Sequence, residues 1–307
     1  MSKTSNAAVI GLGSMGFGMA LSLVRAGFAV AGADVNADAV QRFAAHGRAA
    51  ATPAAAAMGA DIVVVVVVNA AQTRAVLFGP DGAAEAMNPS AVVISCATMS
   101  PKDAEAIAVE TEGRGLLYLD APISGGATRA AEGALTVLAS GGAAAFEKAQ
   151  PALDAMAKKL YRLGDKPGVG AAFKMVNQLL AGVHIAVACE AIAFARRLGL
   201  DLDKVYEVIT GAAGNSWMFE NRVPHILAGD YAPRSAVDIF TKDLGIVMDM
   251  SRDNKFPTPI AGQAFQMFLM TAAAGMGRDD DASVARLYAE IAGLSLPTKG
   301  RAQGPAE

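Results

Sequence analysis

The chain has 307 residues, of which 53% are hydrophobic, and its 29 acidic and 26 basic residues leave a formal net charge of -3. Because charges of both signs are spread along the chain without long blocks, the composition argues against a nucleic-acid partner. A chain of this length is more typical of two domains than of a single core.

The two cysteines, Cys96 and Cys189, lie far apart in the sequence, and neither has a second thiol or a histidine at metal-ligand spacing. A disulfide framework and a metal site are therefore not expected. The N-terminal residues MSKTSNAAVIG lead directly into a strand-like segment without the features of a secretory signal. We expect a cytoplasmic protein.

Two apolar segments require a test for membrane spans. The valine-rich segment 61–68 is far too short to cross a bilayer. The segment 170–195 is long enough, but it carries polar and charged residues, so we interpret it as the buried helix of a soluble domain. No membrane association is expected.

Over residues 1–165, short β-branched segments alternate with amphipathic helical segments. This alternation predicts an α/β fold with a doubly wound, mostly parallel sheet of the Rossmann type. The continuous run VVVVVV favours strands that are covered by helices on both faces. The expected strands are residues 7–13, 29–34, 61–69, 91–98, 115–122 and 134–141.

The segment AVIGLGSMG follows the first expected strand and has glycines in the G-x-G-x-x-G spacing. In dinucleotide-binding folds the first glycine permits a tight turn, the second lets the pyrophosphate approach the backbone, and the third lets helix and strand approach each other. The start of the next helix would face the phosphates. The predicted cofactor-binding turn comprises Gly11, Leu12, Gly13, Ser14, Met15 and Gly16.

Asp34 closes the second expected strand, 23 residues after Gly11, near the offset of the acidic residue that binds an adenosine ribose. Val35 and Asn36 follow it, and no arginine stands beside them to receive a 2′-phosphate. The pattern therefore predicts NAD in preference to NADP, with Asp34 and Val35 at the adenosine end of the cofactor.

Small polar residues stand at the ends of later expected strands, where a doubly wound sheet binds its ligand. Asn69 and Thr98 are two of them, and we predict that both contact the cofactor. Either residue alone is equally well explained as an ordinary turn or cap residue.

The segment DAPISGG follows another expected strand and ends in Ser124, Gly125 and Gly126. Because two side chains are missing, the backbone N–H groups of this loop are accessible to a small anion such as a carboxylate. Considered alone, the segment is also explained as a tight structural loop.

After YRLGDKPGVG (161–170) the strand-like segments stop and the chain becomes helical. We predict a dinucleotide-binding domain at 1–168 and an all-α C-terminal domain at 169–295, joined by a long interdomain helix at about 170–198. Residues 296–307 lack an apolar face and are expected to form a flexible tail. The further helices expected are residues 201–211, 216–227, 234–253 and 257–275.

The start of the long helix, GAAFKMVNQ, carries Lys174, Asn177 and Gln178 in an otherwise small or apolar segment. Their i, i+3, i+4 spacing places the three side chains on one face of the helix. That face either borders a cleft or holds a lysine that simply extends to solvent. The charge of Lys174 opposes the helix dipole at the N-terminus, which favours the functional interpretation.

Four segments, GLGSMG, DAPISGG, GAAFKMVNQ and FTKDLGIVMD (240–249), resemble in this order the motifs of the β-hydroxyacid dehydrogenases related to 3-hydroxyisobutyrate dehydrogenase. The resemblance spans roughly residues 7 to 290. It implies that Lys174 is the catalytic lysine, that Asn177 positions the substrate, and that residues 124–126 bind the substrate carboxylate.

The resemblance also concerns the cofactor side of the site. It implies that Thr98 lies beside the nicotinamide and that Lys242, with Asp243, lies near the cofactor. The family usually has a second asparagine where this chain has Gln178, which we place among the substrate-binding residues.

The resemblance implies an NAD-dependent oxidation of a small hydroxycarboxylate. The leading expectation is L-threonate, oxidised at its 2-hydroxyl to 2-dehydro-L-erythronate (2-oxo-tetronate), with Lys174 as a general base whose pKa burial lowers. Alternative substrates are 3-hydroxyisobutyrate and glycerate or tartronate semialdehyde. A non-catalytic dinucleotide-binding module is the alternative from another class. The apolar helical domain suggests a homo-oligomer, a dimer or a tetramer.

Overall fold

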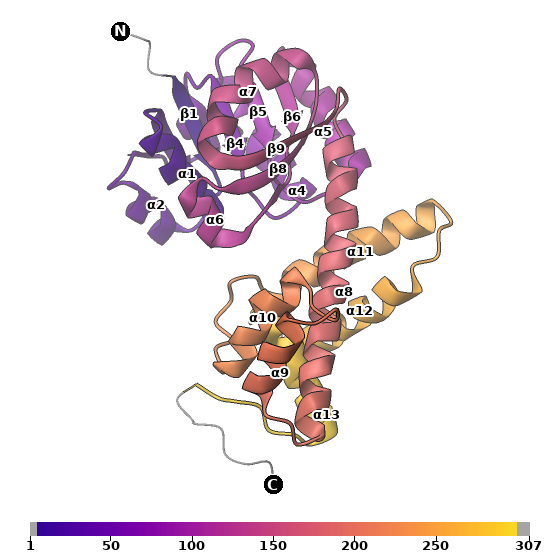
Figure 1. The fold of residues 1–307 in the computed structure, drawn as a ribbon. Coiled ribbons are helices and arrows are strands. Elements are labelled where there is room, and N and C mark those ends of the chain that lie inside the picture. The colour runs from indigo at the N-terminus through magenta and orange to yellow at the C-terminus, as the bar shows by residue number, and fades with distance from the viewer. Residues whose placement is uncertain (1–4, 300–307) are drawn as a thin grey trace. The chain divides into compact units, whose positions relative to one another are not determined.

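The computed structural model describes residues 5–299, and the chain divides into two compact units between Met175 and Val176. The first unit contains a nine-stranded sheet covered by helices, and the second is all-helical (Figure 1). The division falls inside the longest helix, α8 (Val169–Arg197). The predicted fold class, a Rossmann-type sheet followed by an all-α part, is confirmed.

The sheet has the strand order β3-β2-β1-β4-β5-β6-β8-β7, with β9 paired to β8. Strands β1 to β6 are parallel, and their order is that of a dinucleotide-binding doubly wound sheet. Strand β8 runs antiparallel to β6 and β7. The strand bounds are β1 Asn6–Ile10, β2 Ala29–Ala33, β3 Arg48–Ala49, β4 Ile62–Val65, β5 Val92–Ser95, β6 Leu117–Asp120, β7 Ile123–Ser124, β8 Leu135–Ser140 and β9 Ala157–Gly164.

Alternate residues of the central strands enter two different cores. In β4, Ile62 and Val64 belong to the core on one face, and Val63 and Val65 to the core on the other. Both faces are therefore buried, as the valine run predicts. The first face is covered by α1 (Gly16–Arg25), α2 (Ala37–Phe43), α6 (Gly126–Glu132) and α7 (Ala143–Met156), and the second by α3 (Pro53–Ala57), α4 (Ala70–Phe78), a 3-10 turn (Ala84–Ala86) and α5 (Pro101–Glu112).

Several expected strands, among them the first and the valine-rich one, end earlier than their sequences suggest. The valine-rich strand stops at Val65, and the remaining valines form the loop that leads to α4. Val66 N still donates to Ile10 O at 2.8 Å, and the Val66 carbonyl oxygen lies close to the turn at Gly11. The first strand likewise stops at Ile10, before that turn.

Strand β9 is not among the expected strands. Its sequence AKKLYRLG places charges between its apolar residues and resembles a linker, yet it pairs in parallel with β8. Lys158, Lys159 and Arg162 of this strand are exposed. Charged side chains of this kind are typical of an edge strand, which has only one hydrogen-bonded neighbour.

The second unit packs its helices around one apolar core, to which the C-terminal part of α8 contributes Ile185, Cys189 and Ile192. The helical ranges expected from the sequence are present here. The bounds are α9 Leu202–Thr210, α10 Trp217–Leu227, α11 Val237–Asp253, α12 Pro259–Thr271, a π-helical turn Ala272–Met276, a 3-10 turn Asp281–Ser283 and α13 Val284–Ala292. Leu296 packs against this core, whereas residues 300–307 of the expected flexible tail lie outside the described residues.

Buried ionic groups accompany this apolar core. Arg222 donates to both oxygens of the fully buried Asp281, at 2.5 and 3.0 Å, and His225 Nδ1 lies 2.9 Å from Asp280. Although burial opposes it, the Asp281 carboxylate raises the pKa of Arg222 above its ordinary value. Each partner therefore depends on the other for its hydrogen bonds.

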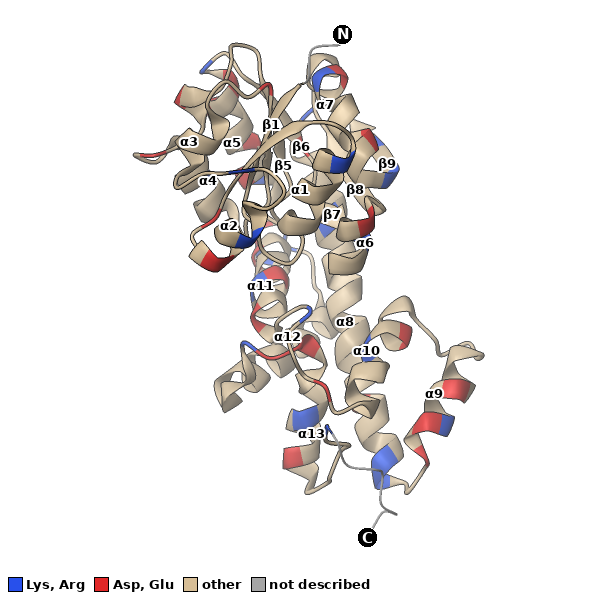
Figure 2. Cartoon of the chain, turned by 90° about the vertical axis from the view of Figure 1, so that its left-hand side faces the viewer, with Lys and Arg blue, Asp and Glu red and all other residues tan. Residues whose placement is uncertain are grey.

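Helix α8 is long and apolar enough, by length and composition alone, to cross a membrane. However, 56% of its most apolar window is buried inside the structure, as in the core helix of a soluble protein. Figure 2 shows that acidic and basic residues are interspersed over the helices of both units, with no single-sign block. The charge distribution agrees with the expectation from the sequence.

Candidate active site

The glycine-rich turn between β1 and α1 uses its three glycines for two different purposes. Gly11 has φ +97, and a Cβ there would lie 2.2 Å from the carbonyl oxygen of Val66. A Cβ on Gly16 would lie 1.8 Å from the carbonyl oxygen of Gly11. A Cβ on Gly13, in contrast, would meet nothing within 4 Å. The fold thus requires Gly11 and Gly16, whereas Gly13 leaves open space for a ligand.

The end of β2 is tied to this turn through Asp34. One oxygen of its carboxylate accepts from Leu12 N at 2.5 Å, and the other accepts from Asn36 N at 2.8 Å. Each oxygen keeps a lone pair that can accept from a ribose hydroxyl. The Val35 side chain is fully exposed. The predicted acidic residue is therefore fixed beside the glycine turn.

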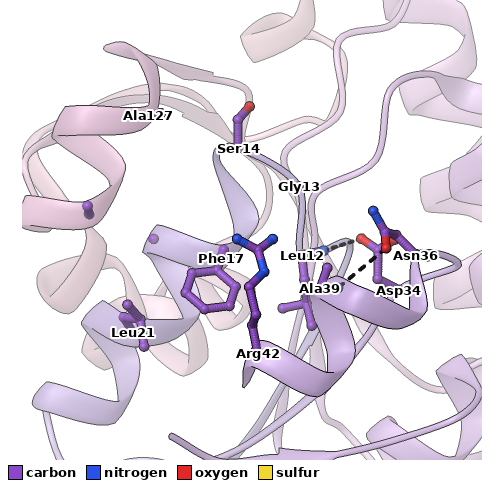
Figure 3. A pocket seen from close by; sticks show the side chains of 12 residues that line it. Leu12, Gly13, Ser14, Phe17, Leu21, Asp34, Asn36, Ala39, Arg42 and Ala127 are labelled. Atoms are coloured by element: carbon purple, nitrogen blue, oxygen red, sulfur yellow. Dashed lines mark hydrogen bonds between the residues drawn. The ribbon is translucent and has the colours of Figure 1, made fainter. Parts of the chain in front are cut away.

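A pocket of about 400 Å³ adjoins the turn and is lined by residues of α1, α2 and α6, together with Ser14 and Asp34 (Figure 3). Arg42 of α2 also lines it, and its guanidinium carbon lies 5.2 Å from the centre of the Phe17 ring. The sequence prediction placed no cation near Asp34, because Arg42 stands on α2 and not among the residues that directly follow the strand. Ala39 of α2 also lines the pocket. Because residues three apart share one face of a helix, the spacing of Ala39 and Arg42 could have indicated that Arg42 faces the same way.

Other residues predicted to contact the cofactor lie in loops and at helix starts of the first unit. Asn69 caps α4, because its side-chain oxygen accepts from Gln72 N at 2.9 Å. Thr98 is half-buried in the loop after β5. Ser14 is exposed at the rim of the glycine turn, and Met15 immediately precedes α1. Helix capping thus accounts for the side-chain oxygen of Asn69.

The structure brings Lys174 to the DAPISGG segment. The Lys174 side chain is 7% exposed, and its Nζ donates to the carbonyl oxygen of Ile123 at 2.8 Å. Ser124 follows Ile123 directly, and Gly125 and Gly126 adopt φ angles of +139 and +77. A Cβ on Gly126 would meet nothing within 4 Å, so this side of the loop is open. A buried lysine therefore lies beside a glycine loop whose backbone is accessible.

The second unit joins four of the predicted residues into one chain of polar contacts. Asn177 Nδ2 donates to Gln178 Oε1 at 2.9 Å, and Gln178 Nε2 donates to Asp243 Oδ2 at 2.5 Å. Lys242 Nζ lies 2.5 Å from Asp243 Oδ1. Gln178 and Asp243 are both buried. The amide of Gln178 therefore has a definite structural task, to link Asn177 to the Lys242–Asp243 pair.

The functional side chains of α8 follow one another along a single helix. Lys174 belongs to the first unit, and Asn177 and Gln178 to the second, at the i, i+3 and i+4 positions of α8. Among the described residues, no group of three or more His, Cys, Asp and Glu side chains is arranged to hold a metal ion.

A Rossmann-type sheet with an open glycine turn and an acidic residue at the end of its second strand, together with a buried lysine beside a glycine loop, is the arrangement expected of an NAD-dependent hydroxyacid dehydrogenase. Residues 6–164 match the NAD binding domain of 6-phosphogluconate dehydrogenase, and residues 168–288 match the family described as "NAD-binding of NADP-dependent 3-hydroxyisobutyrate dehydrogenase". The chain belongs to the 3-hydroxyisobutyrate dehydrogenase-related family of β-hydroxyacid dehydrogenases. The predicted family and the predicted cofactor, NAD, are confirmed.

Known relatives match over almost the whole chain. An L-threonate dehydrogenase of Cupriavidus necator is 54% identical, covering 96% of this chain and 98% of the relative. An L-threonate dehydrogenase of Escherichia coli is 48% identical, covering 94% of this chain and 95% of the relative. A crystal structure of 3-hydroxyisobutyrate dehydrogenase from Salmonella typhimurium matches with a TM-score of 0.88 and 50% identity, covering 92% of this chain and 99% of that one.

Proposed function

We propose that this protein oxidises L-threonate at its 2-hydroxyl to 2-dehydro-L-erythronate, with NAD as the hydride acceptor. The relatives named L-threonate dehydrogenase, at 54% and 48% identity over nearly full length, support this substrate. The observation that carries the chemistry is the hydrogen bond from Lys174 to the carbonyl of Ile123, directly before the Ser124 loop. It places the Lys174 amine next to the proposed carboxylate-binding loop, where a proton-transferring group is needed.

The residues present fit the cofactor. Gly13 leaves space for a pyrophosphate at the start of α1, and Asp34 keeps acceptors for a ribose diol. Leu12, Ser14, Val35, Asn69, Thr98 and Lys242 remain our proposed further contacts. When bound, NAD supplies the electrophilic carbon that accepts the hydride.

Lys174 is the proposed general base. A neutral amine has two N–H donors and one lone pair, so it can keep its hydrogen bond to the Ile123 carbonyl while the lone pair accepts the proton of the substrate hydroxyl. In the reverse direction the ammonium returns that proton. The N–H groups at Ser124, Gly125 and Gly126 hold the substrate carboxylate in this scheme, which leaves the 2-hydroxyl for Lys174. Asn177, fixed by Gln178, orients the substrate.

Replacement of Lys174 tests the base assignment. Lys174→Ala should lower kcat by about 100-fold or more, since general acid–base catalysis contributes about 10²–10⁴-fold. Lys166→Ala, which removes an exposed lysine shortly before α8, is the matched control and should retain wild-type turnover. Near-normal activity of Lys174→Ala would refute the assignment.

A substrate panel tests the specific reaction. NADH formation should be measured with L-threonate, 3-hydroxyisobutyrate and glycerate at saturating NAD. The Salmonella typhimurium structure titled 3-hydroxyisobutyrate dehydrogenase, at 50% identity, makes that acid the second candidate. NADH from 3-hydroxyisobutyrate but none from L-threonate would overturn the proposed substrate. Tight NAD binding without turnover of any acid would instead favour a non-catalytic module.

We further propose a cytoplasmic homo-oligomer. The two buried free thiols, Cys96 and Cys189, support a reducing compartment. Large apolar side chains, each at least half exposed, recur along α8 and just beyond its end, and they fall within about 60° of one helix face at 3.6 residues per turn. They are Phe173, Val176, Leu180, Val187 and Phe194 of α8 and Leu198, which directly follows the helix. A second copy of the chain would cover such a stripe.

Light scattering after size-exclusion chromatography tests the oligomer. Val187→Lys/Phe194→Lys should shift the mass towards the monomer, whereas the control Arg197→Ala, at an exposed position of the same helix, should not. A wild-type protein that is monomeric at micromolar concentration would contradict the proposal.

A further inference from the structure

The start of α8 is held by two side chains of the sheet and has no capping side chain of its own. Gly168, which directly precedes the helix, has φ +95 and no side chain that could cap it. Asp120 Oδ2 accepts from Gly168 N and Ala171 N, both at 2.9 Å. Ser140 Oγ accepts from Gly170 N at 2.9 Å and donates to Asp120 Oδ2 at 3.2 Å. The first helical N–H groups are thus satisfied by the last residues of β6 and β8.

The junction between this helix start and the strand ends is tightly packed. A Cβ on Gly168 would lie 2.9 Å from Glu105 Oε1, and a Cβ on Gly170 would lie 2.3 Å from the carbonyl oxygen of Leu138. Both positions therefore require glycine. Because no side chain intervenes, a change at Asp120 or its partners is transmitted directly to the helix backbone.

The segment that holds the helix start also holds the lysine. Asp120 stands three residues before Ile123, whose carbonyl accepts from Lys174 Nζ at 2.8 Å. Lys174 itself stands three residues after Ala171, whose N–H is bonded to Asp120. The proposed substrate loop follows at residues 124–126. One continuous segment, 120–126, thus fixes the backbone before Lys174, fixes its ammonium group, and forms the loop.

We propose that Asp120 is a positioning residue for the reaction, which sets where Lys174 Nζ lies relative to the loop 124–126 and thereby controls turnover. The inference rests on the proposed function of Lys174. Asp120 is 2% exposed, so it acts through the helix and is out of reach of a substrate. A displacement of about 1 Å at a reacting group can lower a rate about 100-fold.

The ionisation of Asp120 supports a role beyond folding. Burial raises its pKa from 3.8 to about 6, although the N–H groups of Ala171 and Gly168 and the Ser140 hydroxyl oppose the rise. A buried carboxylate with a raised pKa destabilises the folded protein at neutral pH. An acceptor is nevertheless retained at this position, and the N–H groups that it holds at the start of α8 account for it.

Two variants of Asp120 distinguish an effect on the position of α8 from a general loss of folded structure. Asp120→Ala removes the acceptor of two N–H groups and should lower kcat at least 10-fold with little change in the KM for NAD, because the glycine turn is untouched. Asp120→Asn keeps an amide oxygen that can accept the same N–H groups and should restore most of kcat. Equal and full losses in both variants would overturn the inference.

Chemical labelling of lysines gives a readout that does not depend on activity. The protein without substrate is treated briefly with acetic anhydride, and the modification of Lys174 is measured by mass spectrometry relative to the exposed Lys166. In Asp120→Ala the ratio should rise several-fold, as the ammonium loses its fixed place at the Ile123 carbonyl. In Asp120→Asn it should stay near the wild-type value.

The labelling result tests the positioning role of Asp120 separately from the role of Lys174 as the general base. An unchanged ratio in folded Asp120→Ala overturns the positioning role, whatever the activity. A raised ratio supports it even if Lys174→Ala proves active, in which case only the base assignment fails. If Asp120→Ala does not fold, Ser140→Ala serves instead, because it removes the acceptor of Gly170 N and the donor to Asp120 but keeps the Asp120 carboxylate. It should raise the ratio to a smaller extent, and no change would refute the idea.

Discussion

The three glycines of the cofactor turn should respond differently to the same substitution. Gly13→Ala places a methyl group in open space, with no heavy atom within 4 Å, and its backbone φ is not positive. Stability should stay constant or rise by about 0.4–1 kcal/mol, since the unfolded chain loses freedom. Gly16→Ala places its methyl group 1.8 Å from a backbone oxygen, which no rotamer relieves. It should destabilise by about 3 kcal/mol or more.

The effects on cofactor binding should be the reverse of the effects on folding. The methyl group of Gly13→Ala occupies the space that a pyrophosphate needs and separates it from the N–H groups of the turn. Each lost hydrogen bond to a charged group is worth about 1.5–3 kcal/mol, so the Kd for NAD should rise by about 10–100-fold. Gly142→Ala, also in open space but outside the motif, is the control and should bind NAD normally.

Thermal unfolding without NAD and calorimetric titration with NAD measure the two quantities separately. The reasoning requires Gly13→Ala to be as stable as the wild type but deficient in binding. A Gly13→Ala protein that binds NAD within twofold of wild type would show that the open space is not the pyrophosphate site. A Gly16→Ala protein of undiminished stability would show that the helix start can move away from Gly11.

Three further predictions concern the ribose site and two buried carboxylates. Asp34→Ala should raise the KM for NAD by about 10–100-fold and reduce the preference for NAD over NADP, because it removes the charged acceptor of the ribose diol and the repulsion of a 2′-phosphate. Steady-state kinetics with both cofactors checks this, and an unchanged ratio of kcat/KM for NAD to that for NADP would count against it. Arg222→Met should cost about 3–5 kcal/mol in urea unfolding by leaving Asp281 buried and unpaired, and adding Asp281→Asn should recover part of the loss. Because Asp120 has a folded pKa raised from 3.8 to about 6, wild-type stability should fall as pH rises from about 4 to 7, relative to Asp120→Asn, by about 3 kcal/mol at about 1.4 kcal/mol per pH unit. Parallel stability curves of the two proteins over that range would disprove the shift.

Features with local causes could be predicted from the sequence. The glycine spacing, the acidic residue at the end of the second strand and the valine run each reflect a requirement of a few neighbouring residues, and each is present as expected. The long helix was predictable because its composition is uniform over many turns. The same holds for the shared face of Lys174, Asn177 and Gln178, which follows from helix geometry alone.

Features that depend on distant partners could not be predicted. Gln178 has no unusual neighbours in the sequence, and only its contact with Asp243 on α11 reveals its task. Arg42 lines the pocket because it lies on the face of α2 that borders the pocket. In DAPISGG the serine and the glycines suggest a ligand loop, but nothing in the sequence indicates that Asp120 holds the start of a helix 48 positions further on.

The edge strand β9 bears on how the protein behaves at high concentration. An exposed strand edge can recruit the edge of a neighbouring molecule and begin a fibre-like assembly. Lys158, Lys159 and Arg162 place like charges along this edge, so two copies brought edge to edge would repel each other. Neutralisation of these side chains should therefore leave catalysis intact and make the protein prone to precipitate, most of all in high salt, where the remaining repulsion is screened.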